Sequence, residues 1–128
     1  MDYNNLIPEL AVTDLEQSKT FYLDLLGFKV DYERPEDKFL FLSFESSQLM
    51  IEELSDDEKI VLPKTLGRGV NFTLACSDIQ GLYDKILKAN YPIHQPMMTR
   101  EFRVNDSSVL TREFALLDPD GYHFRFND

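Results

Sequence analysis

The chain is short of several residue types, and each shortage excludes a class of protein. Its 128 residues include one cysteine and no tryptophan. Cys76 alone forms neither an internal disulfide nor a cysteine-rich zinc site, and the apolar stretch "FTLACSD" around it indicates a small core residue. No apolar run approaches the roughly 20 residues that span a bilayer, and the first residues do not resemble a secretory signal. We therefore expect a cytoplasmic protein.

Basic residues are also scarce. Lys and Arg number 13 against 23 Asp and Glu, a net charge of −10, which argues against nucleic acid and anionic membranes as partners. The sequence contains no Gly-rich phosphate loop, no Ser–His–Asp order and no Cys–His pairing. A chain of this length buries about two-thirds of its unfolded surface, so a single domain needs no metal for stability.

An internal repeat organises the chain. The stretch "LAVTDLEQ" from Leu10 aligns position by position with "LACSDIQG" from Leu74, at a constant offset of 64. Each copy is an apolar strand that runs into a capping box, with Thr13 and Ser77 as the expected N-caps. The pattern predicts one helix from about Asp14 to Leu26 and another from about Asp78 to Ala89.

Three β-type segments follow each helix. We expect them at Lys29–Arg34, Phe39–Glu45 and Gln48–Leu54, and again near Met97–Val104, Leu110–Leu117 and Tyr122–Phe126. The sequence therefore predicts a single domain, 1–128, that contains two consecutive βαβββ modules. Module 1 spans about 4–54, a polar linker about 55–68, and module 2 about 69–128.

This order predicts an α+β fold, in which two concave mixed sheets form a cup and the helices cover the convex sides. Strand alternation decides which side chains enter the cup. The residues expected to line a ligand pocket there are Glu9, Phe39, Phe41, Met50, Glu52, Asn71, Thr73, Arg112, Phe114, His123 and Arg125. Glu52 and Arg125 take equivalent places in the two halves, so we expect them to pair with each other or to hold polar groups of a ligand. The two roles are compatible, because an internal pair can open toward a ligand. Phe residues at period two are more often core than ligand contacts.

Two segments carry a family resemblance. "IPELAVTDLEQSKTFYLDLLGFKV" and "TREFALLDPDGYHFRF" resemble the vicinal oxygen chelate superfamily, which includes glyoxalase I, extradiol dioxygenases, fosfomycin-resistance enzymes and bleomycin-resistance proteins. The resemblance covers essentially the whole chain. The closing segment is most similar to the bleomycin-resistance proteins.

The resemblance also locates the metal positions of the superfamily's enzymes. They fall on Ile7, Glu52, Asn71 and Arg125. Ile7 has no donor atom and Arg125 is permanently cationic, so only Glu52 remains as a typical ligand. We accordingly expect no metal, no other cofactor and no catalytic residue.

The resemblance then implies a non-enzymatic protein that binds and sequesters a small molecule, such as a cationic aromatic antibiotic, and that forms a homodimer. One alternative is a glyoxalase-like lyase, or another enzyme of the superfamily, with an altered metal site. Another is an interaction or regulatory module whose cup is filled by its own side chains.

Overall fold

The computed structural model describes residues 2–61 and 66–128. Module 1 contains β1 (Glu9–Val12), α1 (Leu15–Lys19), the π-helical η1 (Thr20–Leu25), β2 (Lys29–Arg34), the 3₁₀ turn η2 (Pro35–Asp37), β3 (Phe39–Phe44) and β4 (Ser47–Glu53). The helix α2 (Asp56–Val61) lies in the expected linker, of which residues 62–65 fall outside the described residues. Module 2 contains β5 (Asn71–Ala75), α3 (Ile79–Lys88), β6 (Gln95–Val104), β7 (Ser107–Leu117) and β8 (His123–Asn127). The predicted α+β fold with a repeated βαβββ unit is confirmed.

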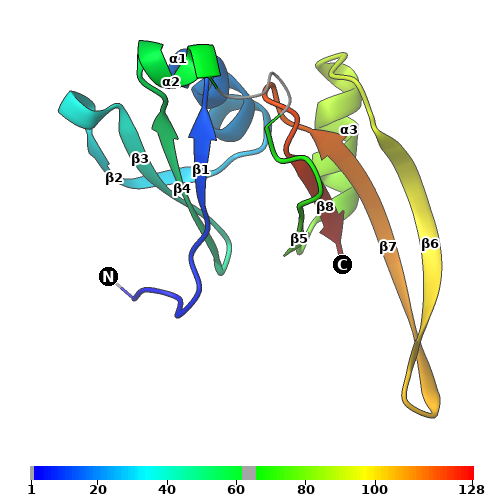
Figure 1. The fold of residues 1–128 in the computed structure, drawn as a ribbon. Helices are drawn as coiled ribbons and strands as arrows, with labels where there is room; N and C mark the ends of the chain where they lie inside the picture. Colours follow the sequence, from blue (N-terminus) through cyan, green and yellow to red (C-terminus); the bar gives the residue numbers. More distant parts are fainter. Residues whose placement is uncertain (1, 62–65) are drawn as a thin grey trace.

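Each module forms one four-stranded mixed sheet. Sheet A has the order β1-β4-β3-β2 and sheet B the order β5-β8-β7-β6. In each sheet the first strand lies parallel to the last, and the remaining pairs are antiparallel. Figure 1 shows β1 and β5 at the facing edges of the two sheets. Within the described residues these edges do not pair with each other, so the sheets do not close into one cup.

The helices begin one residue later than predicted. Asp14, not Thr13, caps α1 by accepting a hydrogen bond from the Gln17 amide at 3.2 Å. Asp78, not Ser77, caps α3 in the same way, accepting from Gly81 at 3.0 Å. A carboxylate at the cap satisfies a free helix amide as a hydroxyl does. The predicted capping boxes were therefore placed one residue too early.

The two hydroxyl residues instead join the modules. Thr13 Oγ1 donates to Asp120 Oδ1 at 2.5 Å, and the Ser77 amide and hydroxyl both donate to Glu45 Oε2, at 3.0 and 3.1 Å. Asp120 lies in the β7–β8 turn and Glu45 in the β3–β4 turn. The closing turn of each module is thus fastened to the start of the helix in the other module.

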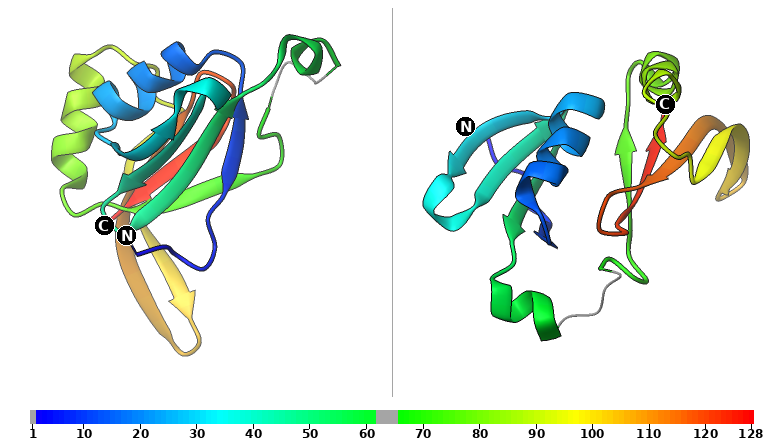
Figure 2. Two further views of the ribbon diagram at one scale, coloured as in Figure 1. Left: turned by 90° about the vertical axis from the view of Figure 1, so that its left-hand side faces the viewer. Right: turned by 90° about the horizontal axis from the view of Figure 1, so that it is seen from above.

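The helix sides of both sheets share one hydrophobic core. Phe44 of β3 lies 5.6 Å from Phe126 of β8, and Tyr22 of η1 lies 5.6 Å from Phe124, between ring centroids. The buried Tyr22 hydroxyl donates to Asp118 at 2.6 Å. Figure 2 shows α1 and α3 on the same side of the molecule when it is seen from above. This core fixes the two modules against each other.

The predicted faces of β7 were wrong. Phe114 pairs with Phe126, stacks on it at 5.4 Å and contacts Tyr83 of α3, so it belongs to the helix-side core. Arg112, two positions away, shares that face and bonds to Asp128 instead of entering a pocket. The repeat equates the two closing turns, but Glu45–Ser46 separates β3 from β4, whereas Asp118–Tyr122 separates β7 from β8. The difference of three residues is odd, and an odd shift exchanges the faces of a strand.

Candidate functional site

Each sheet has an open face, which is the side that faces away from the helices. The open face of sheet A carries four of the predicted pocket residues on β3 and β4, namely Phe39, Phe41, Met50 and Glu52, together with Glu9 and Ala11 on β1. The open face of sheet B carries Asn71, Thr73, Glu113, Ala115, His123 and Arg125. Apart from Ala11, which packs against the shared core, these residues lie outside it.

Aromatic side chains cover the open face of sheet A. Tyr32 stacks on Phe41 at 5.1 Å with an interplanar angle of 14°, and Tyr3 meets the same ring edge-on at 5.5 Å. The Arg34 guanidinium lies 3.8 Å above the Phe39 ring. Phe39 and Phe41 are consequently only 2% and 1% exposed. A ligand on this face therefore meets Tyr3, Tyr32 and Arg34 before it meets either Phe.

Two carboxylates on the same face, Glu9 and Glu52, form no ion pair among the described residues. Glu9 and Glu52 stand on the paired strands β1 and β4, and a hollow of about 390 Å³ is lined by both. Burial, followed by the neighbouring Glu9, raises the pKa of Glu52. Within residues 2–61 and 66–128 no Lys or Arg forms an ion pair with Glu9 or Glu52. The charge of Arg34 acts in the opposite direction but does not outweigh burial and Glu9, so the negative charge of this pair is not fully compensated.

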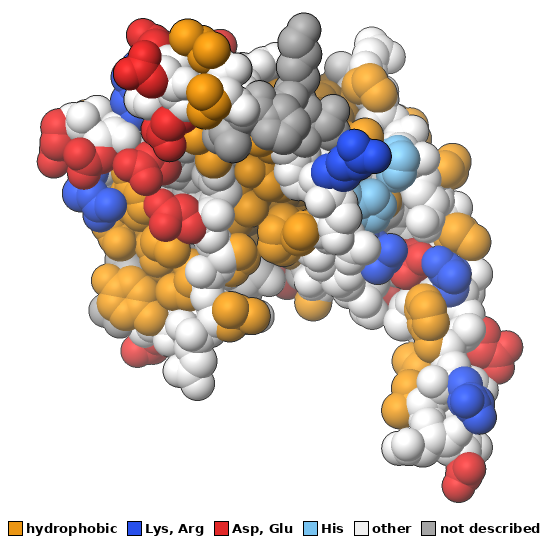
Figure 3. Space-filling view, in the orientation of Figure 1, with side chains coloured by type: hydrophobic (Ala, Val, Ile, Leu, Met, Phe, Trp, Pro, Cys, Tyr) orange, Lys and Arg blue, Asp and Glu red, His pale blue; other side chains and the backbone are white. Residues whose placement is uncertain are grey.

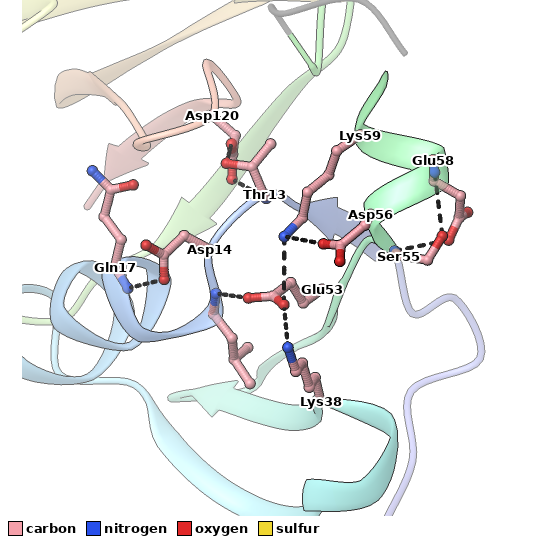
Figure 4. A network of polar contacts seen from close by, with 11 residues as sticks. Thr13, Asp14, Gln17, Lys38, Glu53, Ser55, Asp56, Glu58, Lys59 and Asp120 are labelled. Carbon is pink, nitrogen blue, oxygen red and sulfur yellow. Dashed lines mark hydrogen bonds and ion pairs between the residues drawn. The ribbon is translucent and has the colours of Figure 1, made fainter. Parts of the chain in front are cut away.

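The neighbouring Glu53 has partners, as Figure 4 shows. One of its oxygens accepts from the Leu15 amide at 2.8 Å, and the other accepts from Lys38 Nζ at 2.7 Å. Lys59 of α2 approaches that second oxygen at 3.6 Å. The hydrogen bond from Lys38 and then that from Leu15 lower the pKa of Glu53. Glu53 therefore fixes the start of α1 and is not free to hold a ligand.

A buried carboxylate organises the open face of sheet B. Glu113 is 2% exposed and accepts a hydrogen bond from Arg100 Nη1 at 3.1 Å. Arg125 Nε lies 4.0 Å from the same oxygen, while Arg125 Nη1 donates to Thr73 Oγ1 at 3.3 Å. Two guanidinium groups thus share one carboxylate, which leaves this cluster with a net positive charge.

His123 extends the cationic cluster. Its ring meets that of His94 edge-on, with centroids 5.2 Å apart. Burial lowers the pKa of His123, and the charges of His94 and Arg125 lower it further. The buried Nδ1 of His123 has no hydrogen-bond partner among the described residues. The neutral imidazole therefore keeps unused hydrogen-bonding capacity on the open face of sheet B.

Asn71 and Thr73 also line a groove at the β5 edge. Its volume is about 320 Å³, and its other wall consists of Asn4, Leu6, Pro8 and residues 46–49. This groove joins the two modules but contains neither Glu52 nor Arg125. The predicted pocket residues are therefore distributed over separate places.

The expected Glu52–Arg125 pair is absent from the described part of the chain. Arg125 is paired within sheet B to Glu113, and the groups that shift the pKa of Glu52 are Glu9, Asp37 and Arg34. Figure 3 shows acidic and hydrophobic side chains gathered over sheet A, with Lys, Arg and His over sheet B.

Sequence reasoning missed Glu113, Arg100 and the contact of His94. If β7 had been assigned the opposite face, the alternation of its side chains would have placed Glu113 on the same side as His123 and Arg125.

The residues at the four superfamily metal positions do not suit a metal. Ile7 has no donor atom, and the Arg125 guanidinium is directed to Thr73 and Glu113. Glu52 is the one typical donor, and the carboxylate beside it is Glu9 rather than a residue of module 2. Among residues 2–61 and 66–128, no group of three or more His, Cys, Asp or Glu is arranged to hold an ion. The donor set therefore does not fit the metal of the superfamily's enzymes.

The chain belongs to the Glyoxalase/Bleomycin resistance protein/Dioxygenase superfamily, whose family model matches residues 6–126. It is 31% identical over 118 residues to a protein named "Glyoxalase 1" from Caenorhabditis briggsae. That alignment takes in 92% of this chain but only 40% of the relative, so the chain spans less than half the length of this relative.

Solved structures share the fold. A glyoxalase/bleomycin resistance protein/dioxygenase from Alicyclobacillus acidocaldarius has a TM-score of 0.71 at 20% identity, covering 97% of this chain and 89% of that one. A virulence protein from Salmonella typhimurium has a TM-score of 0.69 at 20% identity, covering 99% and 98%. These likenesses define the fold. No helix in the described ranges is both long and apolar enough to cross a membrane.

Proposed function

We propose that this protein binds a small molecule without transforming it, and that the ligand is a cationic aromatic compound. The observation that carries the proposal is the Glu9–Glu52 pair, which forms no ion pair within residues 2–61 and 66–128 and lies on the sheet face that presents Tyr3 and Tyr32. Carboxylates attract a cation, and tyrosine rings offer stacking area to a planar group. Binding of this kind requires affinity and no metal.

The raised pKa of Glu52 gives the proposal a pH dependence. A cationic ligand favours the ionised carboxylate, so its affinity should fall as the pH drops through the pKa of Glu52, which lies above the ordinary value of 4.5. A neutral aromatic ligand should not show this dependence.

Calorimetric titration with bleomycin and other cationic aromatic antibiotics tests the proposal, together with growth of a sensitive host that expresses the protein. Glu52→Gln should weaken binding by about tenfold, which corresponds to about 1.4 kcal/mol. Glu16→Gln is the matched control, because Glu16 is a carboxylate on α1 whose side chain is 83% exposed. Absence of heat and of protection with every antibiotic would contradict the proposal.

The Tyr32→Ala variant distinguishes a ligand-binding protein from an interaction module whose open face is filled by its own side chains. A ligand-binding protein should lose affinity in this variant. Tyr32 already stacks on Phe41, so a protein without a ligand would lose only stability in this variant. Unchanged affinity in a folded Tyr32→Ala variant would move the ligand away from sheet A.

A glyoxalase-like enzyme is the second candidate, and the relative named "Glyoxalase 1" favours it. The donor set at the four metal positions opposes it. Metal analysis of protein purified without chelator distinguishes the two, because stoichiometric zinc, nickel, manganese or iron would support the enzyme.

We also propose that the protein acts as a homodimer in the cytoplasm. The sheets do not close within one chain, and their open faces carry unlike charge, so a second copy offers each face a complementary one. The single buried Cys76 suits a reducing compartment. Sedimentation velocity measures the assembly directly.

A further inference from the structure

The β6–β7 hairpin is longer than its counterpart in module 1. β6 and β7 have 10 and 11 residues, whereas β2 and β3 have six each. β7 pairs with β8 only over Glu113–Leu117, so over residues 98–112, which we call the arm, the strands β6 and β7 form no ladder with a third strand. Figure 1 shows the arm projecting beyond sheet B. A two-stranded ribbon without a third strand is marginally stable in water. We therefore expect the arm to be stabilised by packing against another surface.

The two faces of the arm differ in character. Phe102 lies opposite Val109 and Arg100 opposite Thr111, on the same face as Glu113. The exposed apolar side chains on this face are Met98, Phe102, Val104 and Val109, at 43%, 40%, 50% and 46% exposure. The reverse face carries Thr99, Glu101, Arg103, Ser108 and Arg112, with Leu110 as its apolar residue. The apolar face of the arm is thus a continuation of the open face of sheet B.

Charge is divided between the two halves of the chain. Residues 1–61 contain 15 acidic and 5 basic side chains, whereas residues 62–128 contain 8 of each. The whole net charge of −10 therefore resides in the first half. A two-fold axis that brings the first half of one copy against the second half of the other avoids contact between the two acidic halves.

The apolar face of the arm is suited to an acidic partner surface. Arg100 lies on it, with the guanidinium 5.2 Å from the Phe102 ring centroid, and no acidic side chain on that face is exposed. Sheet A offers the complement, since its open face combines tyrosine rings with Glu9 and Glu52, two carboxylates that form no ion pair within residues 2–61 and 66–128. Apolar contact and opposite charge then act together.

We propose that the arm is a dimer clasp, in which its apolar face packs on the open face of sheet A in a second copy of this chain. The proposal rests on the homodimer proposed above and adds the surface that holds it together. The arm of the second copy then forms one wall of the ligand site proposed on the open face of sheet A. A two-fold axis makes the contact twice, so each copy gives one arm and receives one.

Sedimentation velocity of the full chain and its variants over a range of concentrations tests the clasp. Phe102→Asp and Val109→Asp place a charge on the apolar face and should raise the dimer dissociation constant by at least about tenfold. Leu110→Asp is the matched control, because Leu110 is the neighbour of Val109, is 69% exposed and lies on the reverse face. The control should remain as dimeric as the unmodified chain.

The possible results separate the clasp from the dimer. A monomeric unmodified chain overturns both. A dimer that survives Phe102→Asp and Val109→Asp overturns the clasp alone, and so does a dimer weakened equally by Leu110→Asp.

Hydrogen exchange of the unmodified chain supplies a measurement that needs no variant. Amides of residues 98–112 should gain protection as the protein concentration rises through the dimer dissociation constant. Unchanged protection across that range also overturns the clasp.

Discussion

Glu113 and Arg125 lie on neighbouring strands of the same sheet, with the Arg125 Nε atom 4.0 Å from a carboxylate oxygen that is already bonded to Arg100. The arginine that replaces a metal ligand of the superfamily is therefore neutralised in part by its own module. Glu52 forms no ion pair among the described residues, and the charge of Arg34 does not outweigh the burial and the neighbouring Glu9 that raise its pKa. This difference separates the two open faces.

Glu113→Gln should destabilise the fold. The substitution leaves Arg100 and Arg125 without an anion beside a buried site, and we expect the free energy of unfolding to fall by about 1–3 kcal/mol. Urea unfolding measures the change. Glu101→Gln, on the exposed reverse face of the arm, should stay within about 0.5 kcal/mol of the unmodified protein. Equal stability of the two variants would show that the buried carboxylate contributes nothing.

His123 should titrate below the ordinary histidine value of 6.5, because burial and the charges of His94 and Arg125 disfavour the imidazolium. Its pKa is lowered in the fold, so the unfolded chain binds a proton first as the pH falls below 6.5. The free energy of unfolding should therefore decrease between pH 6.5 and the lower pKa of the folded state. Imidazole NMR signals followed against pH give that pKa, and His94→Gln should raise it. A folded-state value at or above 6.5 contradicts the prediction.

Tyr22→Phe should loosen the contact between the modules. The variant removes the donor that bonds to Asp118 at 2.6 Å in a fully buried site. We expect a loss of about 1–2 kcal/mol in the free energy of unfolding, measured by urea denaturation. Tyr83→Phe is the control, since the Tyr83 ring contacts Phe114 but no hydrogen bond of its hydroxyl is found among the described residues. A loss of the same size in the control would assign the effect to general packing.

Glu53→Gln should weaken the fold at neutral pH and change its acid sensitivity. The pKa of Glu53 is lowered in the fold, so its contribution is present above 4.5 and is lost as the pH falls through the folded-state pKa. We expect a deficit of about 1 kcal/mol at pH 7 that shrinks below pH 4.5, seen by thermal unfolding at a series of pH values. A deficit that stays constant with pH would show that the charge of Glu53 contributes no stability through Lys38 and Lys59.

The sequence alone determined the βαβββ repeat, since apolar alternation and the copies at Leu10 and Leu74 depend on neighbouring residues only. It also determined the bounds of β2, which is Lys29–Arg34 as predicted. β6 and β7, predicted near Met97–Val104 and Leu110–Leu117, begin earlier, at Gln95 and Ser107. The residues of β3 and β4 on the open face of sheet A were also predicted correctly from this alternation. The two-residue turn Glu45–Ser46 pairs Phe39 with Glu52 and Phe41 with Met50, as the alternation requires.

Tertiary structure decided the rest. The face of β7 depended on the five-residue turn Asp118–Tyr122, whose length matters only once β7 and β8 pair. The partner of Arg125 depended on that face, because reversing β7 brought Glu113 beside it and moved Phe114 into the core. The separation of Glu52 from Arg125 depended on how the two sheets pack, since the shared core of Phe44, Tyr22, Phe124 and Phe126 fixes the modules through their helix sides. Local pattern specifies strands and helices, but contacts between residues far apart in the chain specify which charges meet.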